Sequence, residues 1–452
     1  MTTTTPHDQH EHDLSHLLRS PGFQEWRREV TAIGGCAAPI HLTGSSRIVT
    51  GDGTVLAERA GDILAPCGNR RASVCPACSD RYASDAYHLI RAGMAGGKGV
   101  PESAAAHPRV FVTLTAPSFG PVHTRRVTAR GLVVPCVCGD KHHRDDPRVG
   151  TALDPDGHDY EGAILWQAHA GKLWNRFAIR LRRLLAQVLG VKVRDVRHHA
   201  RLSYAKVAEY QRRGLVHFHA VVRLDGPDGP TTGAPAGITT DGLHAAIREA
   251  AGSVVLTVDR PDGTPLPLTW GRQVDVRPIT STTAAQLEDD DGEITDTALA
   301  AYVAKYATKG TGKSEATDRP IRDISHLRHL DLTEHHRRLI ETAWELGGLA
   351  EYEGLNLRRW AHMLGFRGHF LTKSRAYSTT FGAIRGERRT YRLGETLAAL
   401  DAPVDAGSVL VVNDWQVVAF GHRNDAEREI ALGIAERQRA QRRIRSEPGR
   451  SS

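Results

Sequence analysis

Alternating apolar and polar positions predict two consecutive β-strands near the middle of the chain. In Leu215–Leu224, every second residue from Val216 onward is apolar, whereas His217 and His219 fall in the other row. Side chains of a strand alternate between the two faces of a sheet, so the histidines would share one face and the apolar row could pack under helices. Ser203–Tyr210 is the strand expected immediately before it.

The turn between these strands decides whether Glu209 joins the two histidines. If residues 212–214 form a three-residue loop with Gly214 in the left-handed conformation, Glu209 lies directly opposite His217. A two-residue loop would turn Glu209 to the other face of the sheet. With the longer loop, two imidazoles and a carboxylate would share one face, where they could hold a divalent metal and leave coordination positions open.

A helical pattern follows at Thr295–Gly310. It begins with residues that cap helices well, continues through an alanine-rich middle, and ends at a glycine suited to a helix stop. Tyr302 and Tyr306 are one turn apart on the same face, with Lys305 between them in sequence. By itself this pattern favours an amphipathic helix whose tyrosines pack and whose lysines face solvent.

Together, the histidine strand and the tyrosine helix indicate chemistry on a phosphodiester. A phenol is a weak nucleophile near neutral pH, but it can attack when a metal polarises the phosphate and a nearby cation stabilises the phenolate. The attack would join tyrosine to a 5′-phosphate and leave a free 3′-OH. Two tyrosines one turn apart could accept two strands in succession.

Three motifs of the chain, in this order, resemble those of the HUH endonucleases. Phe111–Pro117 is similar to their first motif, His217-Phe-His219 to their His-hydrophobic-His motif, and Tyr302–Tyr306 to the two-tyrosine motif of rolling-circle initiators. Longer stretches resemble the RepSA-type replication initiators of actinomycete plasmids, namely Cys67–Cys78, Thr113–His123, Ser203–Gln211 and Gly368–Arg375. The resemblance extends from about residue 36 to about residue 385.

The resemblance implies a function and a role for each matching residue. The implied ligands of a catalytic Mg²⁺ or Mn²⁺ ion are His217, His219 and Glu209. Tyr302 and Tyr306 would be nucleophiles, with Lys305 near the scissile phosphate. We expect Tyr302 to cleave first, and Tyr306 is either the second nucleophile or a structural residue.

The expected protein is a plasmid rolling-circle replication initiator. It would bind a double-stranded origin, nick an extruded single-stranded site through a 5′-phosphotyrosine adduct, and later rejoin the strand. A host polymerase would extend the 3′-OH and a host helicase would unwind the DNA, because the sequence contains no complete motor motif. The alternatives are a conjugative relaxase or HUH transposase with the same chemistry, and a non-catalytic, zinc-containing DNA-binding regulator.

The six cysteines predict a structural zinc site. The chain opens with no apolar leader and has no apolar run long enough to span a bilayer, so we expect a cytoplasmic protein whose cysteines are not in disulfides. Cys75-Pro-Ala-Cys78 is a metal knuckle that Cys36 and Cys67 could complete as a Zn²⁺ site, the alternative being reduced, unliganded thiols. A second zinc at Cys136-Val-Cys138 with His142 and His143 is less favoured, because Cys-x-Cys is a poor clamp.

A basic C-terminal part is expected to bind DNA. The 452-residue chain has a net charge of +7 and a pI near 9.2, which favours a polyanionic partner without identifying it. Helices at Thr333–Leu346 and Asn356–Leu364, with a hairpin at Val409–Ala419 turning at Asn413-Asp414, could form a winged helix. The alternative is a small basic helical domain packed on the nuclease. The candidate DNA-binding residues are Arg358, Arg359, Arg367, Lys373 and Arg375.

The expected fold class is α+β, with a central antiparallel sheet flanked by helices as in HUH nucleases and ferredoxin- or RRM-like folds. A zinc-binding region would precede it and a mostly helical DNA-binding region would follow. The expected segments are a disordered His-rich tail (1–20), a Cys-rich zinc-binding region (21–104), the HUH endonuclease domain (105–312), the DNA-binding domain (313–425), and a basic C-terminal helix and tail (426–452). Further elements of the nuclease domain are helices at Ala163–Val188 and Asp241–Ala251 and strands at Val110–Thr115 and Gln273–Arg277.

Overall fold

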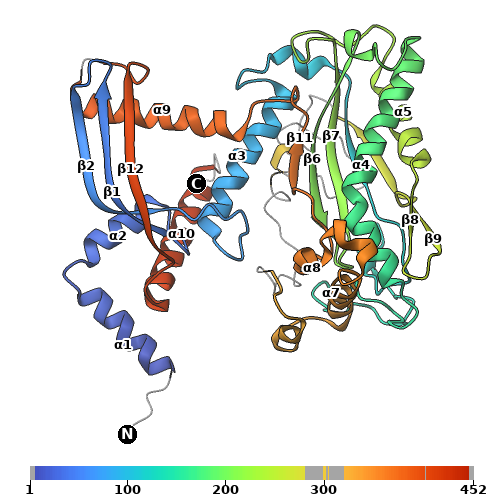
Figure 1. Ribbon diagram of the computed structural model, residues 1–452, viewed down its shortest axis with the longest axis horizontal. Coiled ribbons are helices and arrows are strands. Elements are labelled where there is room, and N and C mark those ends of the chain that lie inside the picture. The colour runs from blue at the N-terminus through green and yellow to red at the C-terminus, as the bar shows by residue number, and fades with distance from the viewer. Residues whose placement is uncertain (1–5, 280–298, 302–303, 305–319, 403, 447–452) are drawn as a thin grey trace. The chain divides into compact units, whose positions relative to one another are not determined.

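The computed structural model of the chain describes residues 6–279, 299–301, 304, 320–402 and 404–446 (Figure 1). They form an α+β protein with antiparallel sheets flanked by helices, as the sequence predicts. The chain divides into two compact units. Unit 1 consists of Met1–Ala86 and Thr380–Ser452, and unit 2 consists of Tyr87–Thr379.

Unit 2 is built on a five-stranded antiparallel sheet with the order β10-β3-β7-β6-β11. Its strands are β3 (Arg109–Leu114), β6 (Arg201–Tyr210), β7 (Val216–Asp225), β10 (Val274–Pro278) and β11 (Leu371–Lys373). Four of these strands were predicted from the sequence, and β7, which carries the two histidines, is the central strand. The central position means that both edges of β7 are paired, so its backbone is held on both sides.

Helices cover the apolar face of this sheet. They are α4 (Tyr160–Leu189), α5 (Thr240–Ser253), α7 (Glu334–Leu346) and α8 (Leu357–Trp360), and α4 runs along the sheet in Figure 1. Asp159 caps α4 by accepting a hydrogen bond from the Gly162 amide, and Gly190 ends it with a φ of 65°. Phe218 on β7 is buried in the same core as Trp166 and Trp174 of α4, so the row of apolar residues packs as predicted.

Unit 2 also contains smaller elements. Among its described residues, β4 (Arg126–Val127) pairs with β5 (Val133–Val134) and β8 (Leu256–Asp259) pairs with β9 (Pro265–Leu268), each as a short hairpin. The 3₁₀ helices of the described residues are η1 (Glu102–Ala106), η2 (Val196–His198), η4 (Ile324–His329), η5 (Ala350–Leu355) and η6 (Ala361–Met363). The predicted helix at Asn356–Leu364 is therefore α8 followed by η6.

Unit 1 combines the two ends of the chain. Its three-stranded antiparallel sheet has β1 (Ile40–Thr50) between β2 (Val55–Ala65) and β12 (Val409–Phe420). Its helices are α1 (Pro6–Arg19), α2 (Phe23–Ala32), the first half of α3 (Pro76–Ala95), α9 (Phe381–Ala399) and α10 (Asp425–Ser446). Val30 of α2 shares an apolar cluster with Ala431 and Ile434 of α10, which joins the N-terminal and C-terminal segments.

The hairpin predicted at Val409–Ala419 is wrong. Asn413 and Asp414 do not turn but continue β12, opposite Ser46 and Ser45 of β1. Pairing along the whole of β1 satisfies the backbone groups of both strands, which outweighs the local turn preference of Asn-Asp. Gly44 allows the close approach, because a Cβ at this position would overlap the Asp414 carbonyl oxygen.

The segment boundaries also differ from those expected. Helices α7 and α8 belong to unit 2 and β12 to unit 1, so they do not form one winged-helix domain. Residues expected in a disordered tail form α1, which contacts α10, and the basic C-terminal helix packs within unit 1 instead of standing alone. These segments are far apart in sequence, and their pairing depends on long-range contacts that local patterns do not encode.

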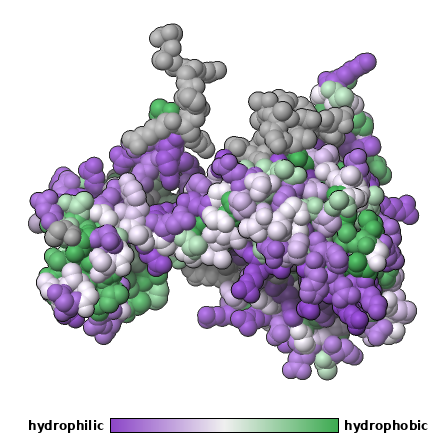
Figure 2. Space-filling view, turned by 90° about the horizontal axis from the view of Figure 1, so that it is seen from above, coloured by the Kyte–Doolittle hydropathy of each residue, from purple (hydrophilic) through white to green (hydrophobic). Residues whose placement is uncertain are grey.

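Apolar side chains at the surface gather on the sheet of unit 1. Leu410, Val412, Val417, Val418 and Phe420 of β12 are all exposed, and Figure 2 shows hydrophobic surface on this unit. Within the described parts of the chain, none of the helices combines the length and apolar character needed to cross a bilayer.

Candidate metal centre

The turn between β6 and β7 has the three-residue form that was predicted. The Gln211 amide donates to the Leu215 carbonyl at 2.9 Å, and the Gly214 amide donates back to the Gln211 carbonyl at 2.9 Å. Gly214 has a φ of 77°, a conformation that glycine adopts without strain. The register that follows pairs Glu209 with His217, which confirms that both lie on one face of the sheet.

Glu209, His217 and His219 bring three donor atoms to one point. Glu209 Oε2 lies 2.8 Å from His217 Nε2 and 3.3 Å from His219 Nε2. An octahedral ion with ligand bonds of about 2.1 Å would separate adjacent donor atoms by about 3.0 Å. The spacing of this triad therefore fits a single divalent ion bound by two imidazoles and a carboxylate.

Side chains around the triad hold His219 in place. Thr113 Oγ1 lies 3.0 Å from His219 Nδ1, and the Phe111 ring stacks on the imidazole at a centroid distance of 5.5 Å. Burial lowers the pKa of His219 to about 4, although Glu209 opposes this shift. His219 is therefore neutral near pH 7, which is the protonation state that binds a metal.

The triad is more open on the side of His217. The His217 side chain is 15% exposed, compared with 4% for His219. The site is therefore reached more easily from His217, while His219 and Glu209 form its more closed side.

The predicted tyrosine helix is only partly described. Residues 299–301 and 304 are helical, as expected, and Leu299, Ala300 and Ala304 are buried. Tyr302, Lys305 and Tyr306 lie outside the described residues. Their approach to the triad stays a prediction.

The four predicted zinc ligands of unit 1 come together. Cys36 follows α2, Cys67 follows β2, and Cys75 and Cys78 lie at the start of α3. The Sγ atom of Cys36 lies 3.7 Å from those of Cys75 and Cys78, and Cys67 Sγ lies 3.7 Å from Cys78 Sγ. A tetrahedral zinc with Zn–S bonds of about 2.3 Å separates its sulfurs by about 3.8 Å, so the cluster fits this ion.

A second cluster forms although the sequence did not favour it, and it differs in one member from the set considered there. Cys136, Cys138 and His142 come together, but the fourth residue is His123, whereas the His143 side chain is 82% exposed. His123 lies thirteen residues before Cys136, a spacing that matches no common zinc motif. Its part in the cluster became visible only in the structure.

The candidate DNA-binding residues lie in unit 2 with varied surroundings. Arg358 and Arg367 are exposed and donate to the Trp344 and Gly354 carbonyls, and Arg359 lies over the Trp360 ring. Arg375 is exposed. Lys373 is half-buried on β11 and donates to the Ser378 carbonyl at 2.8 Å, so it is the member least free to reach a ligand.

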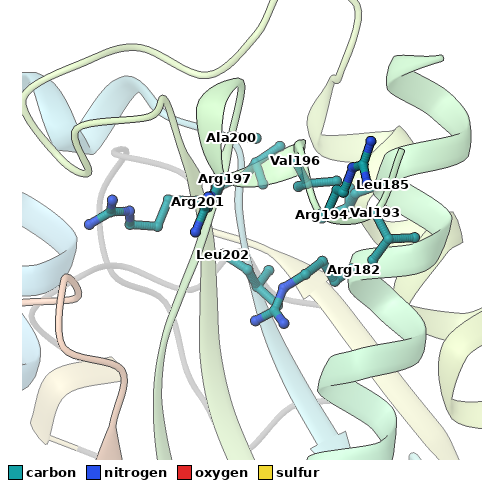
Figure 3. A pocket seen from close by; sticks show the side chains of 10 residues that line it. Arg182, Leu185, Val193, Arg194, Val196, Arg197, Ala200, Arg201 and Leu202 are labelled. Carbon is teal, nitrogen blue, oxygen red and sulfur yellow. The ribbon is translucent and has the colours of Figure 1, made fainter. Parts of the chain in front are cut away.

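A basic cavity that the sequence did not indicate lies elsewhere in unit 2. It has a volume of about 540 Å³ and is lined by arginines of α4, the segment after it and β6 (Figure 3). The arginines are Arg182, Arg194, Arg197 and Arg201, and none of the described lining residues is acidic. Aliphatic side chains, including the paired Leu202 and Leu224, complete the lining.

This cavity is separate from the triad. Leu202 is seven residues from Glu209 on β6, so the two point to opposite faces of the sheet. Arg201 is eight residues from Glu209, which corresponds to about 27 Å along the strand. The cavity and the triad therefore cannot contact the same phosphate.

Comparison with known proteins identifies relatives along nearly the whole chain. The sequence profile of the RepSA family, described as replication initiator protein, pSAM2, matches residues 22–436. A replication initiator protein of Streptomyces ambofaciens is 45% identical over 438 residues, which cover 94% of this chain and 92% of the relative. No solved structure matches the chain.

Proposed function

Because this chain belongs to the RepSA family of plasmid replication initiators, we propose that it starts replication by nicking one strand of origin DNA. The observation that carries the proposal is the convergence of His217, His219 and Glu209 at one point of the central strand pair. Two imidazoles and a carboxylate leave the remaining coordination positions of an ion for water or a phosphate. Bound Mg²⁺ or Mn²⁺ would polarise the scissile phosphate and stabilise the charge that develops on it.

The nucleophile in this proposal is the phenol of Tyr302. Its oxygen forms a bond to the phosphorus as the bond between the phosphorus and the 3′ oxygen breaks. The phenol proton leaves the nucleophile and the departing oxygen gains a proton, which yields a 5′-phosphotyrosine and a free 3′-OH. Lys305 stabilises the phenolate, and Tyr306 accepts a second strand. Attack by a 3′-OH on the phosphotyrosine reverses the step and rejoins the strand.

The Cys36, Cys67, Cys75 and Cys78 cluster is proposed to hold a structural Zn²⁺ in unit 1. Four thiolates saturate a tetrahedral ion and leave no position for substrate. The sulfurs are surrounded by Ile33 and Ala37, so the ion would lie in an apolar core that binds α2 to α3.

The proposed DNA partners are the double-stranded origin and an extruded single strand, with a host polymerase and a host helicase acting after the nick. Arg182 and its three neighbouring arginines offer positive charge at a cavity separate from the triad, which supports a contact with backbone phosphates. DNA held there and at the triad would contact two separate regions of unit 2.

The test is to map the peptide that becomes attached to origin DNA. Unaltered protein is incubated with Mn²⁺ and a suicide oligonucleotide that spans the origin of its own replicon, and the adduct is digested and sequenced. We expect the DNA to be linked to Tyr302. Tyr302→Phe together with Tyr306→Phe should lower adduct formation by more than about 10³-fold while origin binding persists.

A protein that binds the origin but never forms an adduct would support the non-catalytic regulator instead. An adduct formed only on a transfer origin or a transposon end would support the relaxase or transposase alternative. Tyr391→Phe is the matched control, because Tyr391 is an exposed tyrosine of α9 in unit 1.

A further inference from the structure

We infer that His123, Cys136, Cys138 and His142 hold a second, structural zinc ion within unit 2. One donor atom from each residue lies within 4.8 Å of all the others. The four residues belong to the long segment between β3 and α4, outside the histidine triad and outside the Cys36 cluster. Four protein ligands fill a tetrahedral ion, so the site would hold the fold together and would not bind substrate.

The distances from His142 to two of the other donor atoms fit a zinc ion. His142 Nε2 lies 3.3 Å from Cys138 Sγ and 3.3 Å from His123 Nδ1. With Zn–N bonds of about 2.0–2.1 Å and Zn–S bonds of about 2.3 Å, a tetrahedral ion separates two nitrogens by about 3.4 Å and a nitrogen from a sulfur by about 3.6 Å. Two soft sulfurs and two imidazoles are also the donor set that zinc prefers.

A tight turn lets the two cysteines act together despite their Cys-x-Cys spacing. The Gly139 amide donates to the Cys136 carbonyl at 2.8 Å, and the Cys136 amide donates to the Asp140 carbonyl at 2.8 Å. The turn brings Cys138 back toward Cys136 and leaves Val137, between them, 85% exposed. Both cysteines can therefore bind one ion, although a single residue separates them.

Neighbouring groups support the ligands as they do in known zinc sites. The Thr124 amide donates to Cys136 Sγ at 3.3 Å, a contact that favours a thiolate. His142 Nδ1, the ring nitrogen that faces away from the cluster, lies 2.8 Å from Asp146 Oδ2. Arg148 in turn donates to this carboxylate at 2.9 Å. A carboxylate on the far nitrogen of a histidine orients the ring toward a metal.

The segment has few other means of staying folded. Its regular structure, in the described chain, consists of the two-residue strands β4 and β5 and one isolated bridge between Val122 and Ala152. Val127, Leu132 and Val137 are exposed, so they add little to a core. A metal replaces a core in small segments of this kind, because ligand binding and folding occur together.

The metal would also steady the turn that sets the histidine triad. Arg212 Nη2 donates to the Arg144 carbonyl at 2.7 Å, two residues after His142. Arg213 donates to the Ala116 and Pro117 carbonyls at 2.8 Å, near the start of the segment. Both arginines belong to the β6–β7 turn, whose length places Glu209 opposite His217. The second zinc would therefore act as a positioning element for the triad.

The unaltered full-length protein provides the first test. Zinc content is measured by inductively coupled plasma mass spectrometry, and zinc ligation by X-ray absorption. We expect two zinc ions per chain, with an average of three sulfurs and one nitrogen per zinc, since one site has four sulfurs and the other has two. A single zinc with four sulfurs would overturn the inference.

Substitutions provide the second test. Cys138→Ser and His123→Ala should each reduce the zinc content from two ions per chain to one. The average number of sulfur ligands per zinc should then rise toward four. The matched control His143→Ala, at an exposed histidine next to the cluster, should retain two. If Cys138→Ser and His123→Ala also retain two, the inference is wrong. The Cys75→Ser protein should lose the zinc ion of unit 1. The zinc that remains should have two sulfur and two nitrogen ligands.

Discussion

Glu209 lies directly opposite His217 across the β6–β7 pair, and its Oε2 is 2.8 Å from His217 Nε2. This relationship depends on the length of one turn, because a loop of two residues would place Glu209 on the face that α4 covers. The same carboxylate oxygen lies 3.3 Å from His219 Nε2. Glu209 is therefore the residue that joins the two histidines into one candidate metal centre.

Replacing Glu209 by glutamine should weaken divalent metal binding by more than about 100-fold, because a ligand matters more than the outer groups whose loss costs 10- to 100-fold. Glutamine keeps the shape of the side chain and removes the negative charge. A Mn²⁺ titration followed by electron paramagnetic resonance measures the affinity. Glu249→Gln is the control, since Glu249 pairs with Arg180 at the surface of α5. Equal Mn²⁺ affinity of the Glu209→Gln and unaltered proteins would rule out Glu209 as a ligand.

Thr113→Val should lower Mn²⁺ affinity by about 10-fold without unfolding the sheet. The change removes the hydroxyl 3.0 Å from His219 Nδ1 and keeps the β-branched shape. The His219 ring would then lose the group that fixes its orientation. The same titration measures the effect, and thermal unfolding checks stability. Thr257→Val, at an exposed position of β8, should change neither quantity. The proposed orienting role fails if Thr113→Val binds Mn²⁺ normally.

Arg182→Ala combined with Arg197→Ala should make DNA binding less dependent on salt. Each phosphate contact contributes about 0.9 to the slope of log affinity against log salt concentration, so the slope should fall by about 2. Fluorescence anisotropy at several salt concentrations gives this slope. Arg248→Ala with Arg322→Ala is the control, because both are exposed arginines of unit 2 that do not line the cavity. An unchanged slope would show that DNA does not contact the cavity.

Lys206→Met should stabilise the protein most at low pH. Lys206 is buried on the α4 face, where its ammonium lies 3.8 Å from the Phe218 ring centroid, and burial lowers its pKa to about 7. The unfolded lysine has its ordinary pKa of about 10.4, so the unfolded state binds the extra proton between these values and stability rises with pH across that range. Lys206 therefore lowers the free energy of unfolding by its full amount below pH 7 and has no such effect above about pH 10.5.

Urea unfolding at pH 6.5 and pH 9.5 tests this dependence. Lys206→Met should increase the free energy of unfolding by an amount on the order of 3 kcal/mol at the lower pH and much less at the higher. Lys172→Met is the control, because Lys172 is an exposed lysine of α4. A gain that does not depend on pH would mean that Lys206 stays charged in the folded protein throughout this range.

The sequence by itself determined the elements that depend on near neighbours. Alternation identified β6 and β7, and Gly214 indicated the three-residue turn that places Glu209 opposite His217, although the sequence left a two-residue turn open. Thr333 marked the start of α7 in the same way, since its side chain accepts a hydrogen bond from the His336 amide. The Cys75-Pro-Ala-Cys78 spacing likewise indicated its cluster. These features need only short-range sterics and hydrogen bonds, which a local sequence specifies.

Only the tertiary structure decided which distant segments meet. β12 pairs with β1 although more than 350 residues separate them, and this pairing converted a predicted hairpin into a single strand. His123 joined Cys136 because the chain between them folds back, and the arginine cavity combines α4 with β6. The backbone groups at a strand edge pair with whichever strand the folded chain brings near, and a metal cluster is completed by whichever side chain lies within reach. That choice depends on the packing of the whole unit, so no local pattern contains it.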